Sequence, residues 1–458
     1  MLAAGAGSRF GGGKLLAPLA GRPVLQHVLD RLSDAGIDDV VVVLGREAPA
    51  IERAIAWRSE RRVVNAEPER GLASSLHAGM GALSPDTTAV IVALGDQPAV
   101  APATIRALID APDDPGRPVV VPVYTDETGR NPVLVRRAAF ALVEEAHGDR
   151  GLGPVLADHG ELVQEVLVAG DNPDVDTRAD LARAVEATWA DRVRANADQV
   201  ERVREVPDGA DFYAPVRSLF RADPRRTDDP ILDELLTLVR SGDRWLDVGA
   251  GAGRFALPIA RALDPSGGSV VAIDSSPSML DALREIVEDD AVENIRVVEA
   301  RWPPADPSAF EADVALIAHV GYDVEAIGAF LDGLDAAATR LCVAVLMEHA
   351  PASAADPFWP PVHGEARSAL PALAEFVELL RARGREPSVR RVSGQPRRFE
   401  SVDALAGFLR RQLWIDPAGP KEPRLQDALR ELAAADGDGW TIRGRPAMET
   451  GVVTWRPS

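Results

Sequence analysis

Two glycine-rich stretches decide the fold class of this chain: Leu2-Ala-Ala-Gly-Ala-Gly-Ser-Arg-Phe-Gly-Gly-Gly-Lys14 and Trp245-Leu-Asp-Val-Gly-Ala-Gly-Ala-Gly-Arg254. Each has the small residues that suit a turn between a strand and a helix, and each is followed by its own series of alternating strand and helix patterns. Because this alternation is typical of sheets covered by helices, we expect two α/β units.

The apolar pattern of the first unit predicts a helix that begins at Pro23 and ends at Gly36. Apolar runs followed by turn residues predict buried strands over 40–44, 89–94, 119–123 and 162–168, and a helix over 181–194 closes the unit. In the second unit the pattern predicts helices over 231–239, 255–263 and 279–287, and strands over 245–248, 270–273, 295–298, 314–318 and 341–346.

Two stretches without a sustained period mark the borders of these patterns. Glu205–Pro230 is rich in proline, aspartate and arginine, and we interpret it as a connection and as a substrate-side segment of the second unit. Pro351–Pro361 is interpreted as a lid or crossover, and the remaining C-terminal part as completing the sheet and capping the substrate. The predicted domains are 1–192, a linker with the leading segment of the second unit over 193–230, and 231–458.

Composition excludes several classes of protein. Acidic residues outnumber basic ones by 71 to 50 in 458 residues, a net charge of -21, which argues against a nucleic-acid binder because such proteins need a basic face. The longest apolar run has seven residues (341–347), whereas a membrane span needs about 20. No basic start followed by an apolar stretch and cleavage site is present, so we expect a cytoplasmic protein without membrane partners. The one cysteine, Cys342, excludes an intrachain disulfide and is interpreted as a small buried hydrophobe.

The first glycine turn has the composition of a phosphate-binding loop, because small residues let backbone N–H groups approach phosphate oxygens. Lys14 and Arg9 add positive charge, and Lys14 is one of two lysines in the chain. The alternative is a flexible loop with incidental charges. The stretch is not a P-loop, since leucine follows Lys14, and the glycines at 5, 7 and 11 have the wrong spacing for a dinucleotide-binding fingerprint.

This turn resembles the nucleotidyltransferase pattern Leu-Ala-Ala-Gly-x-Gly-x-Arg-(Met/Phe)-Gly…Lys, and is most similar to that of the molybdenum cofactor cytidylyltransferases and their relatives. Its Ala-Ala-Gly is more typical of the cytidylyl than of the guanylyl branch. Other stretches follow in the family's order: Gly71-Leu-Ala-Ser-Ser-Leu-His-Ala-Gly79, Leu94-Gly-Asp-Gln-Pro98, Gly129-Arg-Asn-Pro-Val133, Gly148-Asp-Arg-Gly151 and Asp174-Val-Asp-Thr177.

Two aspartates are candidate metal ligands. Asp96 follows a predicted buried strand, at the sheet edge where ligands of open α/β sheets bind. Its carboxylate suits Mg²⁺, which is held by few carboxylates plus substrate phosphates. The resemblance implies that Asp176, with Asp174 as a less certain neighbour, is the second ligand. An aspartate after a strand can also simply form a turn.

The resemblance also implies the remaining roles. Lys14, Arg9 and Asp96 are the expected catalytic residues, and Asn131 and Asp149 are expected near the acceptor. His77 can contact the nucleotide or pack locally. The expected nucleotide-binding residues are Leu2, Ala3, Ala4, Gly5, Gly7, Lys14, Ser74 and Ser75.

The implied reaction transfers a nucleotidyl group, expected to be cytidylyl from CTP, to a phosphorylated pterin-type acceptor such as molybdenum cofactor, with release of pyrophosphate. Molybdoenzymes are candidate partners. Transfer to a sugar phosphate, on a similar fold, is the alternative. Relatives usually have several residues before Leu-Ala-Ala-Gly that form a central strand, whereas one residue precedes it here. A start codon placed too late is the explanation we favour; a damaged domain that binds nucleotide without turnover, in a regulatory protein, is the other.

The second glycine turn pairs glycines with two acids. Asp247 precedes the alternating glycines Gly249, Gly251 and Gly253, where bulky side chains would block a ligand, and Asp274 ends the next predicted strand, where a carboxylate can accept both ribose hydroxyls. NAD-binding folds share this order, but Gly-x-Gly-x-x-Gly fails because position 254 is arginine. The form Asp-x-Gly-x-Gly-x-Gly resembles class I S-adenosylmethionine-dependent methyltransferases.

The remaining candidates are placed by this second resemblance. Arg301 stands where an acidic residue near the adenine is common, and Trp302 can stack on adenine or belong to the core. His319 and Tyr322 border the methyl-acceptor side, where His319 is either a general base or a structural histidine. The arginine-rich stretch Arg381–Arg398 is interpreted as a solvated face or a substrate-side cap.

Together these resemblances imply two Rossmann-like three-layer domains, a GT-A-like nucleotidyltransferase sheet followed by a class I methyltransferase sheet. The expected protein is a bifunctional transferase that uses Mg²⁺, CTP and S-adenosylmethionine and methylates an unknown small molecule.

Overall fold

The computed structural model describes residues 1–458 apart from 6, 126–128, 208–222, 395–396, 446 and 458. The chain folds as two compact units, Met1–Val185 and Glu186–Ser458, and the division falls inside helix α7 (Arg178–Val203). Most of the predicted substrate-side segment before Pro230 lies outside the described residues.

The sheet of the first unit is mixed. Three parallel strands in the order β5-β4-β1 meet a four-stranded part in the order β6-β8-β7-β9. Leu2 joins the two parts, because its N–H donates to the Ala93 carbonyl at 2.8 Å and its carbonyl accepts from the Gly95 N–H at 2.9 Å. The strands are β1 (Leu2–Ala3), β4 (Val41–Leu44), β5 (Arg61–Val64), β6 (Ala89–Val92), β7 (Val119–Tyr124), β8 (Val133–Arg136) and β9 (Val163–Val168).

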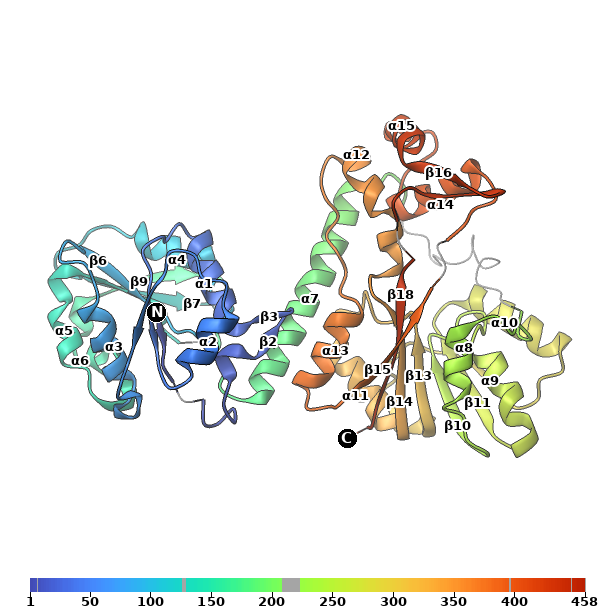
Figure 1. Cartoon of the computed structure of the whole chain (residues 1–458), viewed down its shortest axis with the longest axis horizontal. Coiled ribbons are helices and arrows are strands. Elements are labelled where there is room, and N and C mark those ends of the chain that lie inside the picture. Colours follow the sequence, from blue (N-terminus) through green and yellow to red (C-terminus); the bar gives the residue numbers. More distant parts are fainter. Residues whose placement is uncertain (6, 126–128, 208–222, 395–396, 446, 458) are drawn as a thin grey trace. The chain divides into compact units, whose positions relative to one another are not determined.

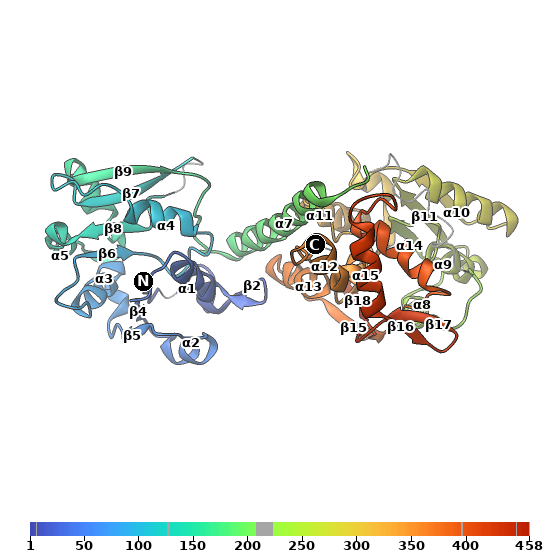
Figure 2. The same ribbon diagram turned by 90° about the horizontal axis from the view of Figure 1, so that it is seen from above.

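Helices cover this sheet (Figures 1 and 2). The predicted helix after Pro23 is confirmed as α1 (Val24–Asp34), which buries its apolar stripe, and Gly36 follows it with φ of 87°. The predicted buried strands at 40–44, 89–94, 119–123 and 162–168 correspond to β4, β6, β7 and β9. The other helices are α2 (Ala48–Ala54), α3 (Leu72–Gly81), α4 (Pro102–Ile109), α5 (Ala141–Glu144) and α6 (Gly153–Asp158).

The second unit contains a seven-stranded sheet in the order β12-β11-β10-β13-β14-β18-β15. β18 runs antiparallel to both its neighbours, and the pairs from β12 to β14 are all parallel. The chain moves outward in one direction from β10 to β12 and in the other from β13, so the crevice between β10 and β13 is where such sheets bind ligands. The strands are β10 (Arg244–Val248), β11 (Ser269–Asp274), β12 (Ile295–Glu299), β13 (Ala312–Ala318), β14 (Ala338–Met347), β15 (Ser388–Ser393) and β18 (Glu449–Trp455).

Helices lie on both faces of this sheet (Figure 1). On one face, α8 (Pro230–Leu236), α9 (Ala256–Leu263) and α10 (Pro277–Asp289) share an apolar core with the strands. On the other lie α11 (Ile327–Ala337) and α13 (Leu373–Ala382). The sequence predicted all five strands from β10 to β14, and β15 and β18 complete the sheet as expected of the C-terminal part.

A small subdomain with its own apolar core, which we call the cap, stands over the end of the sheet where β14 ends and β18 begins (Figure 1). It consists of a 3₁₀ segment, η9 (Pro351–Phe358), with α12 (Trp359–His363), α14 (Val402–Leu413), α15 (Glu422–Leu432) and the hairpin β16 (Ala433–Asp436) and β17 (Gly439–Ile442). None of the described helices is both long enough and apolar enough to cross a membrane.

Candidate active sites

The first site centres on the ammonium of Lys14, which is 7% exposed. Its Nζ donates to Asp96 and, at 3.0 Å, to Oδ1 of Asp176. Asp96 comes from the loop after β6, and the Val175 N–H donates to the Asp96 carbonyl at 2.9 Å, which ties the two acidic loops together. The structure thus brings together three residues that the sequence singled out separately.

The charges of this cluster are coupled. Burial alone would lower the pKa of Lys14, but the contacts with Asp96 and Asp176 outweigh it and raise that pKa, so the lysine stays charged. Burial, and then the nearby Asp96, raise the pKa of the Asp174 carboxyl. Lys14 contacts both Asp96 and Asp176, and Arg9 also faces Asp176, so the carboxylates occupy these cations and leave no surplus positive charge for a polyphosphate.

That charge balance fits a divalent cation. Asp96 and Asp176 offer oxygen ligands in one place, and Mg²⁺ is usually held by one or two carboxylates together with substrate phosphates. Among the residues that the structure describes, no three His, Cys, Asp or Glu side chains are grouped to hold a metal by themselves. A cation here would therefore need substrate oxygens to complete its coordination.

The glycine turn wraps around Lys14. Gly7 has φ of 55°, and a Cβ there would lie 3.3 Å from Cγ of Lys14, so both the conformation and the passage of the lysine stem favour glycine. Arg9 is exposed and reaches Oδ2 of Asp176 at 3.6 Å. Gly5 has open space around its Cβ position, whereas Leu2, Ala3 and Ala4 are buried.

A cavity of about 330 Å³ opens beside this turn, lined by Ala3, Ala4 and Gly5 on one side. Its lining also includes Arg46, Glu47 and Glu69, which the sequence reasoning missed. The missed signal is Gly45-Arg-Glu directly after the buried strand β4, at the same edge of the sheet. Glu47 also accepts a hydrogen bond from the Gly13 N–H at 2.8 Å, which ties this loop to the glycine turn.

Ser74 and Ser75 begin α3, and both are held by a residue that the sequence reasoning did not single out. Nδ2 of Asn65, which follows β5, donates to their hydroxyls at 2.8 and 3.0 Å. Ser74 also donates to the Gly71 carbonyl at 2.8 Å. Asn65 therefore orients the polar start of this helix.

The expected acceptor residues lie on separate loops. Asp149 sits against the start of α3, since a Cβ on Gly71 would be 2.5 Å from its Oδ1. The carbonyl of Asn131 accepts from the Tyr124 hydroxyl at 2.7 Å. His77 hydrogen-bonds the Val143 carbonyl through Nε2 at 2.9 Å, which is the local packing alternative.

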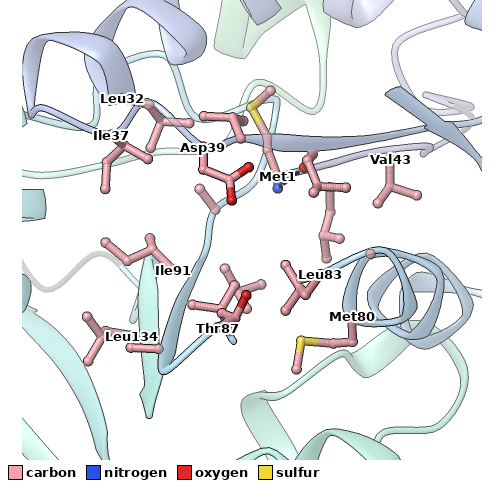
Figure 3. Close-up of a pocket in the computed structure, with 18 of the residues that line it drawn as sticks. Met1, Leu32, Ile37, Asp39, Val43, Met80, Leu83, Thr87, Ile91 and Leu134 are labelled. Carbon is pink, nitrogen blue, oxygen red and sulfur yellow. Dashed lines mark hydrogen bonds between the residues drawn. The ribbon is translucent and has the colours of Figure 1, made fainter. Parts of the chain in front are cut away.

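A second cavity of the first unit, of about 350 Å³, has a different character (Figure 3). Its lining is mostly apolar and includes Asp39 and Thr87, which precede β4 and β6, whereas Asp96 follows the carboxyl end of β6. The Met1 ammonium donates to the Val41 carbonyl at 2.8 Å, and burial lowers its pKa to about 5. This cavity is therefore distinct from the cluster around Lys14.

The second unit has a cavity of about 670 Å³ at the crevice between β10 and β13. Asp274, at the end of β11, lies in its wall and accepts from the N–H groups of Gly251 and Ser276, both at 2.8 Å. The carboxylate is thus fixed in orientation and keeps lone pairs for further donors, as a ribose-binding acid requires. This observation supports the fit to an adenosine-type ligand.

Glycine is needed at three positions of this turn, but the physical reason differs from one position to the next. All have positive φ, of 74°, 53° and 81° for Gly249, Gly251 and Gly253. A Cβ on Gly249 would lie 2.4 Å from Val320, and one on Gly253 would lie 2.5 Å from Leu283, so packing requires both. Only around Gly251 is the space open, so ligand approach applies to that position alone.

Asp247, at the end of β10 before the glycine turn, is buried. Burial, and then the nearby Asp274, raise the pKa of its carboxyl to about 7. Neither carboxylate oxygen has a hydrogen bond of normal geometry with a described residue, although the Ala256 amide is close enough to favour the charged form. A cationic ligand beside it would stabilise the carboxylate.

Arg301 and Trp302 both line this cavity. Trp302 is half-buried; it donates from Nε1 to the Phe330 carbonyl at 3.2 Å and packs edge-on against Phe310, and these two contacts hold the ring in place. Arg254, which we did not single out as a site residue, lines the cavity too and pairs with Asp229 at 2.6 Å.

His319 and Tyr322 follow β13, with His319 in the cavity wall and in a left-handed conformation at φ of 58°. Nδ1 of His319 is buried without a hydrogen-bond partner among the described residues, and burial lowers the pKa of the ring to about 4. The imidazole is therefore neutral at pH 7, with a hydrogen on one ring nitrogen and an acceptor lone pair on the other. Tyr322 is buried, and its hydroxyl accepts from the Met347 N–H at 2.7 Å.

Family models match both halves of the chain. Residues 1–166 match the MobA-like NTP transferase domain, and residues 246–335 match a methyltransferase domain. The chain therefore carries a nucleotidyltransferase domain followed by a methyltransferase domain, each on the fold that its sheet defines.

Curated relatives match over part of their length. Bifunctional protein GlmU of Sinorhizobium fredii is 32% identical over 149 residues, which cover 32% of this chain and 33% of GlmU. GlmU of Alkalilimnicola ehrlichii is 38% identical over 136 residues, or 29% of each chain. The chain thus spans about a third of the length of the curated relatives it matches.

Two solved structures match part of the chain. Rv0371c from Mycobacterium tuberculosis is 36% identical, with a TM-score of 0.36 over 40% of this chain and 93% of its own. Precorrin-6y C5,15-methyltransferase from Geobacter metallireducens is 15% identical, with a TM-score of 0.32 over 53% of this chain and 95% of its own.

Proposed function

We propose that the first domain transfers a cytidylyl group from CTP to the terminal phosphate of a phosphorylated pterin-type acceptor such as molybdenum cofactor. The main support for this proposal is the position of the Lys14 ammonium between Asp96 and Asp176, at the edge of the sheet where ligands bind. The choice of CTP rests on the Ala3-Ala4-Gly5 turn and its resemblance to the cytidylyl branch.

In the proposed reaction an acceptor phosphate oxygen attacks the α-phosphorus of CTP. A new P–O bond forms as the bond between the α- and β-phosphates breaks, and pyrophosphate leaves with that electron pair. Lys14, Arg9 and the N–H groups of the glycine turn align the phosphates and offset their charge. Asp96 and Asp176 would hold Mg²⁺, which supplies charge neutralisation on the phosphate oxygens when bound.

The test is pyrophosphate release by the full chain with Mg²⁺ and molybdenum cofactor, using CTP, GTP and UTP in parallel. Release with CTP at least tenfold faster than with the others is the expected result. Release with a sugar 1-phosphate but not with molybdenum cofactor would overturn the proposed acceptor. Nucleotide binding without any release would favour the regulatory alternative.

For the second domain we propose that S-adenosylmethionine binds in the cavity between β10 and β13 and that its methyl group passes to a small molecule. Asp274 would accept hydrogen bonds from the ribose hydroxyls. The carboxylate of Asp247 would offset the positive charge of the ligand. The acceptor's nucleophilic atom forms a bond to the methyl carbon while the carbon–sulfur bond breaks. His319, which is neutral and lines the cavity, would take the proton that the acceptor loses.

The test of this half is calorimetric titration of the full chain with S-adenosylmethionine and S-adenosylhomocysteine. Binding of both is expected, and its loss in Asp274→Ala would support the assignment. An unchanged affinity in that variant would remove Asp274 from the site.

A further inference from the structure

A third cavity in the second unit, of about 190 Å³, lies between the cap and the sheet. Its floor is formed by Met347, at the end of β14, and by Thr450, at the start of β18. Its upper wall comes from the cap residues Phe399, Phe408 and Ile442. We call it the cap cavity.

The cap cavity has an aromatic wall. The rings of Phe399 and Phe408 are 5.3 Å apart between centroids, and Phe408 is 6% exposed and belongs to the core of the cap. Such a wall suits the apolar body of an organic ligand, because pockets bury ligands mainly against apolar and aromatic side chains.

Two arginines give this apolar cavity a positive charge. The guanidinium of Arg397 lies 4.5 Å from the Phe408 ring centroid and 5.5 Å from that of Phe399. Arg397 has no hydrogen bond or ion pair from its guanidinium to any described residue, and it is exposed at its outer side. Partial burial, and then the like charge of Arg411, lower the pKa of Arg397.

Arg445 is the second cation of the lining. It donates to the carbonyl and hydroxyl oxygens of Ser353 at 2.6 and 3.1 Å, and the charge of Asp356 offsets its burial only in part, so its pKa is lowered. Both guanidiniums line the cap cavity, and neither forms an ion pair with a carboxylate of the described residues, in a chain of net charge -21. Such an arrangement is suited to an anion, since arginine pairs well with carboxylate and phosphate groups.

The cap cavity and the larger cavity are lined at the ends of neighbouring strands, by Met347 at the end of β14 and by His319 after β13. The His319 N–H donates to the Val345 carbonyl at 2.8 Å, and the Met347 N–H donates to the Tyr322 hydroxyl at 2.7 Å. These bonds join the ends of β13 and β14, and neighbouring strands are about 4.8 Å apart. The two cavities have separate linings, and the residues that line them at this edge belong to hydrogen-bonded neighbouring strand ends.

We propose that the cap cavity holds the anionic end of the methyl acceptor, which makes the acceptor an organic anion: an aromatic or aliphatic body with a carboxylate or phosphate group. The body lies against Phe399 and Phe408, and the anionic group pairs with Arg397 and Arg445. This inference rests on the proposed methyltransferase function and names the substrate class of that site.

The test is a ligand-observed NMR titration of the full chain, with benzoate and phenyl phosphate as anionic probes and benzyl alcohol as a neutral probe of similar shape. At least one anion is expected to bind at least tenfold more tightly than benzyl alcohol. Arg397→Gln is the most direct variant, because the Arg397 guanidinium has no hydrogen bond with a described residue, and the bond from the Thr441 hydroxyl to the Arg397 carbonyl is kept. This variant should lower the affinity for the anion at least tenfold. Arg443→Gln, which replaces an exposed arginine outside the lining, should leave that affinity unchanged.

The same titrations are repeated with saturating S-adenosylhomocysteine. Continued anion binding is expected, since the two cavities have separate linings. Displacement of the anion, equal binding of benzyl alcohol, or equal losses in the two arginine variants would overturn the proposal. Nucleoside binding without anion binding would reject this inference alone, whereas Arg397-dependent anion binding without nucleoside binding would reject the proposed methyltransferase function.

Discussion

The ammonium of Lys14 meets Oδ1 of Asp176 at 3.0 Å, although 162 positions separate the two residues in the sequence. Asp96 contacts the same ammonium from the loop after β6. One cation thus organises two acidic loops at the edge of the sheet, and its removal would leave two carboxylates facing each other.

Replacing Lys14 by methionine should therefore slow nucleotidyl transfer strongly. We expect the rate of pyrophosphate release to fall by about 100-fold or more, because the cation that is positioned on the phosphates is lost. The control is Lys421→Met, which removes the chain's other lysine, in the cap, where its Nζ donates to the Val203 carbonyl. Activity of Lys14→Met close to that of the control would show that this ammonium has no catalytic role.

The glycines at 251 and 253 should respond differently to alanine. Gly253→Ala places a methyl group against Leu283 at positive φ, so we expect the free energy of unfolding in urea to fall by about 1–3 kcal/mol. Gly251→Ala meets open space and should cost about 1 kcal/mol for its conformation. Its main effect should be weaker S-adenosylmethionine binding. Equal affinities in both variants would contradict the assignment of ligand approach to Gly251.

Sequence reasoning succeeded where one local pattern carries the information. The strand Val41–Leu44, buried at all four residues, and the turn at Gly249–Gly253 are recognisable from apolar runs followed by small residues. The site residues Lys14, Asp96 and Asp176 were singled out separately, but their shared contact depends on how three loops meet, which no spacing encodes.

Other features were not predictable because they arise from distant packing. Asn65 is a single polar residue after a strand whose four arginine and valine residues are all exposed or half-exposed, and nothing nearby indicates that it holds Ser74 and Ser75. The arginine-rich stretch 381–398 was interpreted as a solvated face or a cap. The structure divides it: Arg383 pairs with Glu186 and Asp332, whereas Arg397 lies on the aromatic wall of the cap cavity.

Asp274→Asn should weaken S-adenosylmethionine binding about tenfold or more, because ribose hydroxyls lose a charged acceptor. The amide keeps one oxygen of the same shape, so the bonds from Gly251 and Ser276 are disturbed less than by alanine. The matched control is Asp281→Asn on the exposed side of α10, where the carboxylate pairs with Arg284 at 2.9 Å. Calorimetry of both variants checks the prediction, and equal affinities would contradict it.

Binding of S-adenosylmethionine should also depend on pH through Asp247. Its carboxyl has a pKa of about 7 in the free protein, raised by burial and by Asp274, so it is mostly protonated at pH 6 and mostly ionised at pH 8. A cationic ligand favours the ionised form, and affinity should therefore fall as the pH drops, by about tenfold between pH 8 and pH 6.

Asp247 should affect the stability of the unliganded chain with the opposite pH dependence. A raised carboxyl pKa means that the folded state keeps a proton that the unfolded state has lost, so the contribution to unfolding free energy declines as the pH rises from about 4 to about 7. Asp247→Asn cannot titrate and should remove both trends, while any titration of the ligand's own amino group remains in its binding curve. The measurement is paired calorimetry and urea unfolding of the two proteins across this range. Identical pH profiles would mean that Asp247 keeps one protonation state throughout, and that the ligand's charge is balanced elsewhere.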